Sequence, residues 1–101
     1  MMQASLLIVD DEEIALRNLQ HVMEKVGYQV TATQSGATAL ALLASRRFDV
    51  VLTDLRMEGV DGMDVLNSSR ELQPEAEVIF ITGFATAESA VQALKHGAFY
   101  Y

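Results

Sequence analysis

The sequence contains no cysteine, which excludes disulfide bonds, thiolate metal sites and cysteine nucleophiles. It also lacks a long hydrophobic run. The longest apolar stretch, residues 39–44, is far shorter than the roughly 20 residues of a membrane-spanning helix. The first five residues carry no positive charge, and the apolar run at residues 6–9 is too short for a signal peptide. We therefore expect a cytoplasmic protein without a membrane partner.

Basic residues are scarce: 7 Lys and Arg stand against 14 Asp and Glu, and the formal net charge is −7. Direct binding of nucleic acid by this chain is disfavoured, because contacts with phosphates need clustered Lys and Arg. An acidic surface instead suits cations, or partners with a basic face. Half of the 101 residues are hydrophobic and 21% are charged, which is typical of a single globular domain.

Short apolar segments alternate with segments of helical periodicity along the whole chain. Three of the apolar segments are almost uninterrupted, as in parallel strands that are buried on both faces. Glycines at positions 27 and 97 follow helical segments, and Ser35 and Asp61 stand where helix caps are expected. The predicted strands are residues 6–9, 29–33, 50–53 and 78–82, and the predicted helices are residues 14–26, 35–46, 61–73 and 86–96.

Repeated strand–helix units predict an α/β fold, in which a parallel sheet carries helices on both faces through right-handed crossovers. Ligands of such sheets collect at the carboxyl ends of the strands, near the point where the strand order reverses. Three of the predicted strands end in polar side chains at that edge. These side chains are Asp10 and Asp11 after the first strand, Asp54 after the third, and Thr82 at the end of the fourth.

If the first and third strands are neighbours, their ends lie about 5 Å apart, and Asp10, Asp11 and Asp54 form a cluster. Carboxylates at that separation raise one another's pKa values unless a cation neutralises them. Carboxylates, a backbone carbonyl and water are the ligands of Mg²⁺, which often binds a substrate phosphate as well. The cluster therefore predicts magnesium-dependent phosphoryl transfer, in which one carboxylate is the nucleophile and Thr82 bonds a phosphoryl oxygen.

Each of these residues also has a simpler interpretation. The acidic run that begins at Asp10 suits the first turn of a helix, where the helix dipole favours negative charge. Asp54 suits a turn after a strand, and Thr82 is an ordinary β-branched residue at a strand end. Their joint placement at three strand ends of one sheet favours the functional interpretation.

The order of these motifs resembles the receiver domain of bacterial response regulators, and the resemblance covers the whole chain. It implies a single receiver domain over residues 1–101, with a flavodoxin-like, doubly wound parallel sheet of strand order 2-1-3-4-5. The similar segments are residues 7–12 with the acidic pair, 49–57 around Asp54, the turn at 61–62, the strand at 79–83 and the passage at 95–101.

The resemblance implies a role for each candidate residue. Asp54 would accept the phosphoryl group, Thr82 would be the switch hydroxyl, and Tyr101 would be the aromatic switch. The phosphodonor would be a sensor histidine kinase. The chain would assist its own phosphorylation and dephosphorylation without being an enzyme in the usual sense. The Mg²⁺ ligands would be Asp11 directly, Asp10 through water, Asp54, and the backbone carbonyl of Arg56.

A finer resemblance concerns the output of the signal. Residues 82–86 and 90–95 look like the receivers of nitrogen-regulator-type (NtrC-like) enhancer-binding activators. Those proteins carry an AAA+ ATPase and a DNA-binding domain downstream of the receiver. The resemblance therefore implies that a parent chain regulates transcription.

The sequence departs from the family pattern at two places. Glu58 stands where many members have proline. The family's lysine three residues beyond the switch aromatic is missing, because the sequence stops at Tyr101, and Lys95 belongs to the fourth helix instead. We expect an incomplete fifth strand, no fifth helix and a bare sheet face that favours self-association.

Two other functions stay open from the residues alone. Phosphatases of the haloacid-dehalogenase type also use an aspartyl nucleophile, but a second Asp follows it two positions later. Arg56 occupies that position here, which disfavours this enzyme class. A receiver-like module that acts by protein contacts without phosphorylation is the other alternative. It is disfavoured for the parent protein by the presence of Asp10, Asp11, Asp54 and Thr82, and the missing lysine leaves it open for this chain.

Overall fold

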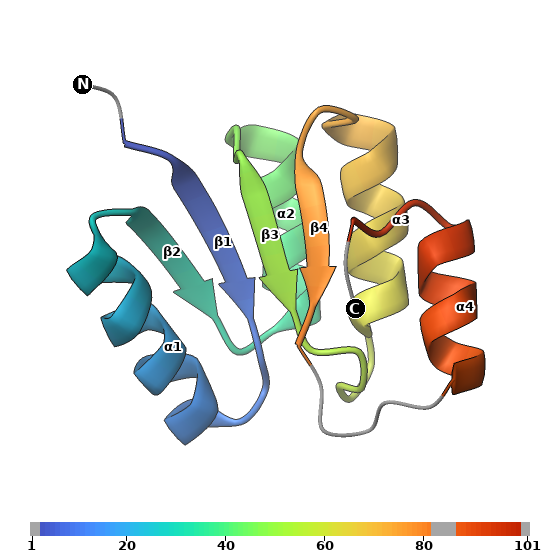
Figure 1. The fold of residues 1–101 in the computed structure, drawn as a ribbon, viewed down its shortest axis with the longest axis horizontal. Coiled ribbons are helices and arrows are strands. Elements are labelled where there is room, and N and C mark those ends of the chain that lie inside the picture. The colour runs from blue at the N-terminus through green and yellow to red at the C-terminus, as the bar shows by residue number, and fades with distance from the viewer. Residues whose placement is uncertain (1–2, 82–86, 100–101) are drawn as a thin grey trace.

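The computed structural model describes residues 3–81 and 87–99. The sequence predictions for Thr82, Tyr101 and the start of the fourth helix at Thr86 lie outside the described residues. Strands and helices alternate along the described chain (Figure 1). The elements are β1 Ser5–Val9, α1 Glu13–Val26, β2 Gln29–Thr33, α2 Gly36–Ser45, β3 Val50–Thr53, α3 Gly62–Leu72, β4 Glu77–Phe80 and α4 Ala87–Lys95.

The four described strands form one parallel sheet in the order β2-β1-β3-β4. This order confirms the flavodoxin-like topology, and it places the first and third strands side by side as expected. In the ladder between them, Leu6 pairs with Val50 and Val9 pairs with Thr53. After α4, the backbone N–H of Phe99 donates to the carbonyl of Val78 at 2.7 Å. The chain therefore returns beside β4, on the side away from β3.

Alternate residues of the strands face two separate hydrophobic clusters, so both faces of the sheet are packed. Helices α2, α3 and α4 cover one face, where Leu7, Val51 and Val78 are fully buried. On the other face, α1 buries Leu16 against Leu6, Ile8 and Leu52. Among the described elements, α1 alone covers this second face. Self-association through it remains a prediction, which light scattering at micromolar concentration tests.

The helix ends follow the local sequence signals. The Ser35 side chain accepts a hydrogen bond from the backbone N–H of Thr38 at 3.1 Å, which caps α2. Gly27 ends α1 in a left-handed conformation, with φ 116°, where glycine has no steric cost. The prediction for α2 was one residue too long, since Arg46 is already extended and follows the last helical residue. None of the helices in the described parts of the chain is long and apolar enough to cross a lipid bilayer.

Candidate functional site

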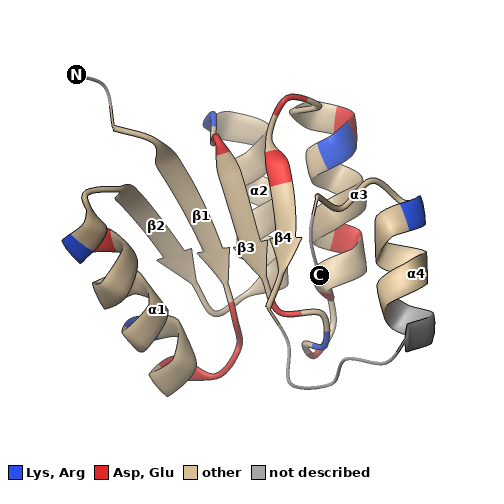
Figure 2. Ribbon diagram, viewed as in Figure 1, with Lys and Arg blue, Asp and Glu red and all other residues tan. Residues whose placement is uncertain are grey.

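The acidic residues singled out in the sequence lie where β1 and β3 end. Val9 and Thr53 are paired in the ladder, so the next residue of each strand, Asp10 and Asp54, leaves the sheet at the same edge. The backbone N–H of Asp54 still donates to the Val9 carbonyl at 2.9 Å. Figure 2 shows acidic residues in the segments that follow the β1 and β3 arrowheads. The parallel pairing thus converts two distant positions in the sequence into neighbours.

Asp10, Asp11 and Asp54 form the carboxylate cluster of this edge. Each offers one carboxylate oxygen, and these oxygens all lie within 4.8 Å of one another. Asp10 and Asp54 are half-buried, whereas Asp11 is exposed. The cluster therefore has two partly enclosed carboxylates and one that faces solvent.

Asp10 is held in place by the start of the first helix. Its Oδ1 accepts a hydrogen bond from the backbone N–H of Glu12 at 2.9 Å. Burial raises the pKa of Asp10, and the negative charges of Asp54 and Asp11 raise it further, while the hydrogen bond from Glu12 opposes the increase. The fold thus keeps Asp10 in a position that disfavours its own charge.

Asp54 has a carboxylate oxygen without a partner. Its Oδ1 is buried and accepts no hydrogen bond from any described residue. A buried carboxylate oxygen without a donor costs free energy unless a cation or another ligand satisfies it. Three convergent carboxylate oxygens form the hard-oxygen ligand set that a divalent cation requires. The residues present therefore fit a metal ion, and the donor chemistry favours Mg²⁺ or Ca²⁺ over softer metals.

The loop between β3 and α3 leads away from Asp54 and carries Arg56. The backbone N–H of Gly62 donates to the Leu55 carbonyl at 2.9 Å and closes the loop. Asp61 caps α3 by accepting hydrogen bonds from the backbone N–H groups of Met63 and Asp64. Arg56 is exposed on this loop. Beside it opens a hollow of about 310 Å³, which Leu55, Arg56, Met57, Asp61 and Met63 line.

Two glycines at this edge have roles that the sequence alone did not reveal. A Cβ on Gly62 would lie 2.8 Å from the Leu55 Cα and 2.8 Å from the Phe80 ring, and even closer to the Asp54 carbonyl oxygen. A Cβ on Gly36 would overlap Val60 of the loop. Gly62 was visible in the sequence only as part of an Asp-Gly turn, and no pattern marked Gly36, because such contacts join distant segments.

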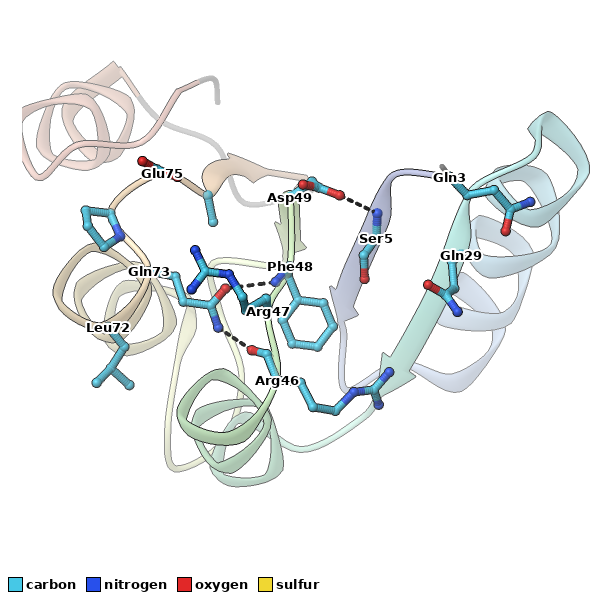
Figure 3. A pocket seen from close by; sticks show the side chains of 12 residues that line it. Gln3, Ser5, Gln29, Arg46, Arg47, Phe48, Asp49, Leu72, Gln73 and Glu75 are labelled. Carbon is cyan, nitrogen blue, oxygen red and sulfur yellow. Dashed lines mark hydrogen bonds between the residues drawn. The ribbon is translucent and has the colours of Figure 1, made fainter. Parts of the chain in front are cut away.

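A larger hollow, of about 860 Å³, lies at the opposite end of the sheet (Figure 3). It contains none of the residues singled out for phosphoryl transfer. Gln73 lines this hollow, and its side-chain amide forms hydrogen bonds with the backbone N–H of Phe48 and the backbone carbonyl of Arg46. Ser5 and Asp49 are joined at the same end, where the Ser5 N–H donates to the Asp49 carboxylate at 2.7 Å. Among the polar side chains of this hollow, the Gln73 amide and the Asp49 carboxylate are thus occupied by backbone groups.

The comparisons with known proteins agree with this geometry. The family model described as the response regulator receiver domain matches residues 6–101. A photosynthetic apparatus regulatory protein, RegA of Rhodovulum sulfidophilum, is 40% identical over 94 residues, which are 93% of this chain and 51% of that protein. The regulatory protein AtoC of Escherichia coli K12 is 41% identical over 96 residues, or 95% of this chain and 21% of its own length.

Solved structures share the fold as well. A CheY-like response regulator receiver domain protein from Methanospirillum hungatei superimposes with a TM-score of 0.94 at 29% identity, over 99% of this chain and 80% of that one. A response regulator from Burkholderia pseudomallei, solved with a phosphorylated aspartic acid, a calcium ion and citrate, gives a TM-score of 0.92 at 31% identity. It aligns with 98% of this chain over 58% of its own.

The chain spans about half the length of RegA and about a fifth of AtoC. The match to the family model, in contrast, covers nearly the whole chain. It extends over β1, β3 and the acidic edge that the two strands build. The chain therefore belongs to the response regulator receiver domain family.

Proposed function

We propose that Asp54 is the phosphoacceptor of this receiver domain and that Asp10, Asp11 and Asp54 hold the Mg²⁺ that the transfer requires. The observation that carries the proposal is the buried Oδ1 of Asp54, which has no partner among the described residues although it lies in a cluster of three carboxylates. A receiver domain acts by accepting a phosphoryl group on an aspartate. The related protein from Burkholderia pseudomallei, solved with a phosphorylated aspartic acid and a calcium ion, supports the same assignment.

The chemistry follows from the arrangement of the carboxylates. A carboxylate oxygen of Asp54 attacks the phosphorus atom of the donor, the bond from phosphorus to the donor's leaving group breaks, and an acyl phosphate forms. A bound Mg²⁺ supplies positive charge for the phosphoryl oxygens and for the carboxylates themselves. Asp11 would bind it directly and Asp10 through water, and the backbone carbonyl of Arg56 would add an oxygen ligand. Asp10 would be held in place by its bond from Glu12.

The proposal extends to the partners of the domain. The donor would be a histidine kinase that meets the chain in the cytoplasm, and the chain would assist its own phosphorylation and dephosphorylation. Thr82 would bond the phosphoryl group and Tyr101 would turn inward with it. RegA and AtoC are named as regulatory proteins and are longer than this chain. We infer that this receiver likewise controls an output in a longer protein, with an NtrC-like transcriptional activator as the specific model.

Incubation with acetyl phosphate and Mg²⁺, followed by intact mass measurement, tests the proposal. We expect a mass gain of one phosphoryl group that is abolished by Asp54→Asn, because the amide is a poor nucleophile. Asp49→Asn is the matched control. It removes a carboxylate at the other end of the sheet and keeps the oxygen that accepts from Ser5, so it should be phosphorylated normally.

Two results would contradict the proposal. An unchanged mass in the native chain would support a module that acts by contacts alone. Multiple turnover on a phosphate ester would instead support a phosphatase. Repeating the incubation with EDTA isolates the contribution of the metal, and we expect the mass gain to disappear with it.

A further inference from the structure

The first turn of α2 touches the loop that follows Asp54. Gly36, the first residue of α2, is buried, and the space for a side chain there is taken by Val60. A Cβ on Gly36 would lie 2.9 Å from the Val60 carbonyl carbon and 2.9 Å from its Cβ, and closer still to its carbonyl oxygen. Two of these three atoms belong to the backbone, so the loop itself would have to move to admit a methyl group.

The helix side of this contact is firmly held. The backbone N–H of Ser35 donates to Thr33 Oγ1 at 3.1 Å, and Ser35 Oγ accepts from the N–H of Thr38 at 3.1 Å. Ala39 and Leu43 are buried in the core one and two turns later. Because cap and core both hold the helix, a collision at Gly36 would displace the loop rather than α2.

The loop side of the contact has few other constraints. It is anchored at its ends by the Gly62–Leu55 hydrogen bond and by the Asp61 cap. Between those anchors, residues 56–60 make no hydrogen bond with any described residue. Only side-chain packing holds this part: Met57 packs against the core, and Val60 lies against Gly36. Arg56 lies in the same unbonded stretch.

We propose that Gly36 is a positioning residue for the metal site. Because Gly36 has no side chain, the loop packs against α2 at Val60. This contact sets the position in which the loop holds the backbone carbonyl of Arg56. The inference rests on the proposed function, because it assigns that carbonyl to Mg²⁺. Groups behind the direct ligands influence metal affinity in this way in other proteins, typically by about 10- to 100-fold.

Gly36→Ala separates this role from ordinary helix stability. Gly36 has no positive φ, and alanine is a better helix former than glycine. If the contact at Val60 had no role in positioning the loop, the substitution would therefore leave the metal site unchanged and strengthen α2. With the contact, the loop shifts and the carbonyl of Arg56 leaves its position. We expect Mg²⁺ affinity to fall about tenfold.

The measurement is a Mg²⁺ titration followed by backbone amide NMR shifts, with spectra of the metal-free chains recorded first. Leu42→Ala is the matched control, since Leu42 packs against the core from the later part of α2. Its truncation loosens the packing of α2 and adds no atom at Val60. The proposal expects metal-free shift changes at residues 56–60 in Gly36→Ala and not in Leu42→Ala. It also expects the loss of Mg²⁺ affinity in Gly36→Ala alone.

A second pair of variants covers the case in which Gly36→Ala fails to fold. Val60→Gly removes the Cβ, the one side-chain atom on the loop's side of the contact, without crowding the helix, and should weaken Mg²⁺ binding. Val60→Ala keeps that Cβ and should bind nearly as the native chain does. Native Mg²⁺ affinity in Gly36→Ala, or an equal loss in Leu42→Ala, would overturn the inference alone. Failure of the native chain to bind Mg²⁺ would instead overturn the proposed function and the inference with it.

Discussion

The two ends of the sheet use their polar groups in opposite ways. At the amino ends of the strands, the Gln73 amide accepts from the Phe48 N–H at 2.8 Å and donates to the carbonyl of Arg46 (Figure 3). It also donates to the carbonyl of Leu43 at 2.8 Å. At the carboxyl ends, three carboxylates converge, and Asp54 Oδ1 is buried without a partner among the described residues. At the amino end the Gln73 amide is satisfied by backbone groups, whereas at the carboxyl end one buried oxygen of Asp54 is left available.

The state of the polar groups distinguishes the end that stabilises the fold from the end that binds a ligand. The volumes of the two hollows do not make this distinction. The amino end has the larger hollow, about 860 Å³ against about 310 Å³. Its polar groups, however, hold α2, β3 and α3 together. The carboxyl end concentrates negative charge, which is unfavourable without a cation. Substitutions at the amino end should therefore change folding, and those among the carboxylates should change ligand binding.

The largest effect on stability is expected from Gln73→Leu. The change removes three hydrogen bonds and leaves the Phe48 N–H and the carbonyls of Leu43 and Arg46 without their partner. We expect urea unfolding to show a loss of about 2–4 kcal/mol, since each unsatisfied group costs about 1–3 kcal/mol and water reaches some of them.

Gln3→Leu is the control for this prediction, because Gln3 lines the same hollow and is exposed. It should alter stability by less than about 0.5 kcal/mol. Mg²⁺ affinity should stay native in both variants. A large drop in Mg²⁺ affinity in Gln73→Leu would break the separation between the two ends.

A smaller loss of stability is expected from Gly62→Ala. The new methyl group would press on the Leu55 Cα and the Phe80 ring, and overpacking of this kind costs about 1–3 kcal/mol. Asn67→Ala provides the control, because it introduces alanine at an exposed position of the same helix, where it should be neutral or slightly stabilising. Equal melting temperatures for the two variants would show that the loop yields easily at Gly62.

The smallest effect, and the one with opposite sign, is expected from Asp10→Asn without metal. Burial and the charges of Asp54 and Asp11 raise the pKa of Asp10 above 3.8. The folded chain then holds this proton more tightly than the unfolded chain does, so ionised Asp10 destabilises the fold above its folded pKa. The variant keeps the oxygen that accepts from Glu12 and should gain less than about 1 kcal/mol, since solvent screens the cluster.

The pH dependence gives this prediction its test. In metal-free thermal melts, the advantage of Asp10→Asn should be absent below about pH 3.8 and should grow as the pH rises through the folded pKa of Asp10. Mg²⁺ should reverse the order of the two proteins, because it stabilises the native cluster more. An advantage that is constant from pH 3.5 to 7 would mean that the charge of Asp10 is not its cause.

Much of the fold could be predicted because its signals are local. Nearly continuous apolar segments predicted parallel strands, and Ser35, Asp61 and Gly27 marked helix ends that the structure confirms. Asp10, Asp11 and Asp54 could be selected because each follows a predicted strand, and parallel strands end at a common edge. Thr82 and Tyr101 were also selected, and they lie outside the described residues.

The sequence by itself thus determined the alternation of strands and helices, a parallel sheet with helices on both faces and the acidic character of one edge, because periodicity and charge can be read from consecutive residues. The strand order was expected from the family resemblance. Only the tertiary structure decided how Gly36 and Gly62 admit the loop, how Gln73 joins α3 to α2 and β3, and which oxygen of Asp54 is left without a donor. These features depend on contacts between segments that are distant in the sequence. A glycine or a glutamine at one position does not indicate which distant segment it will contact.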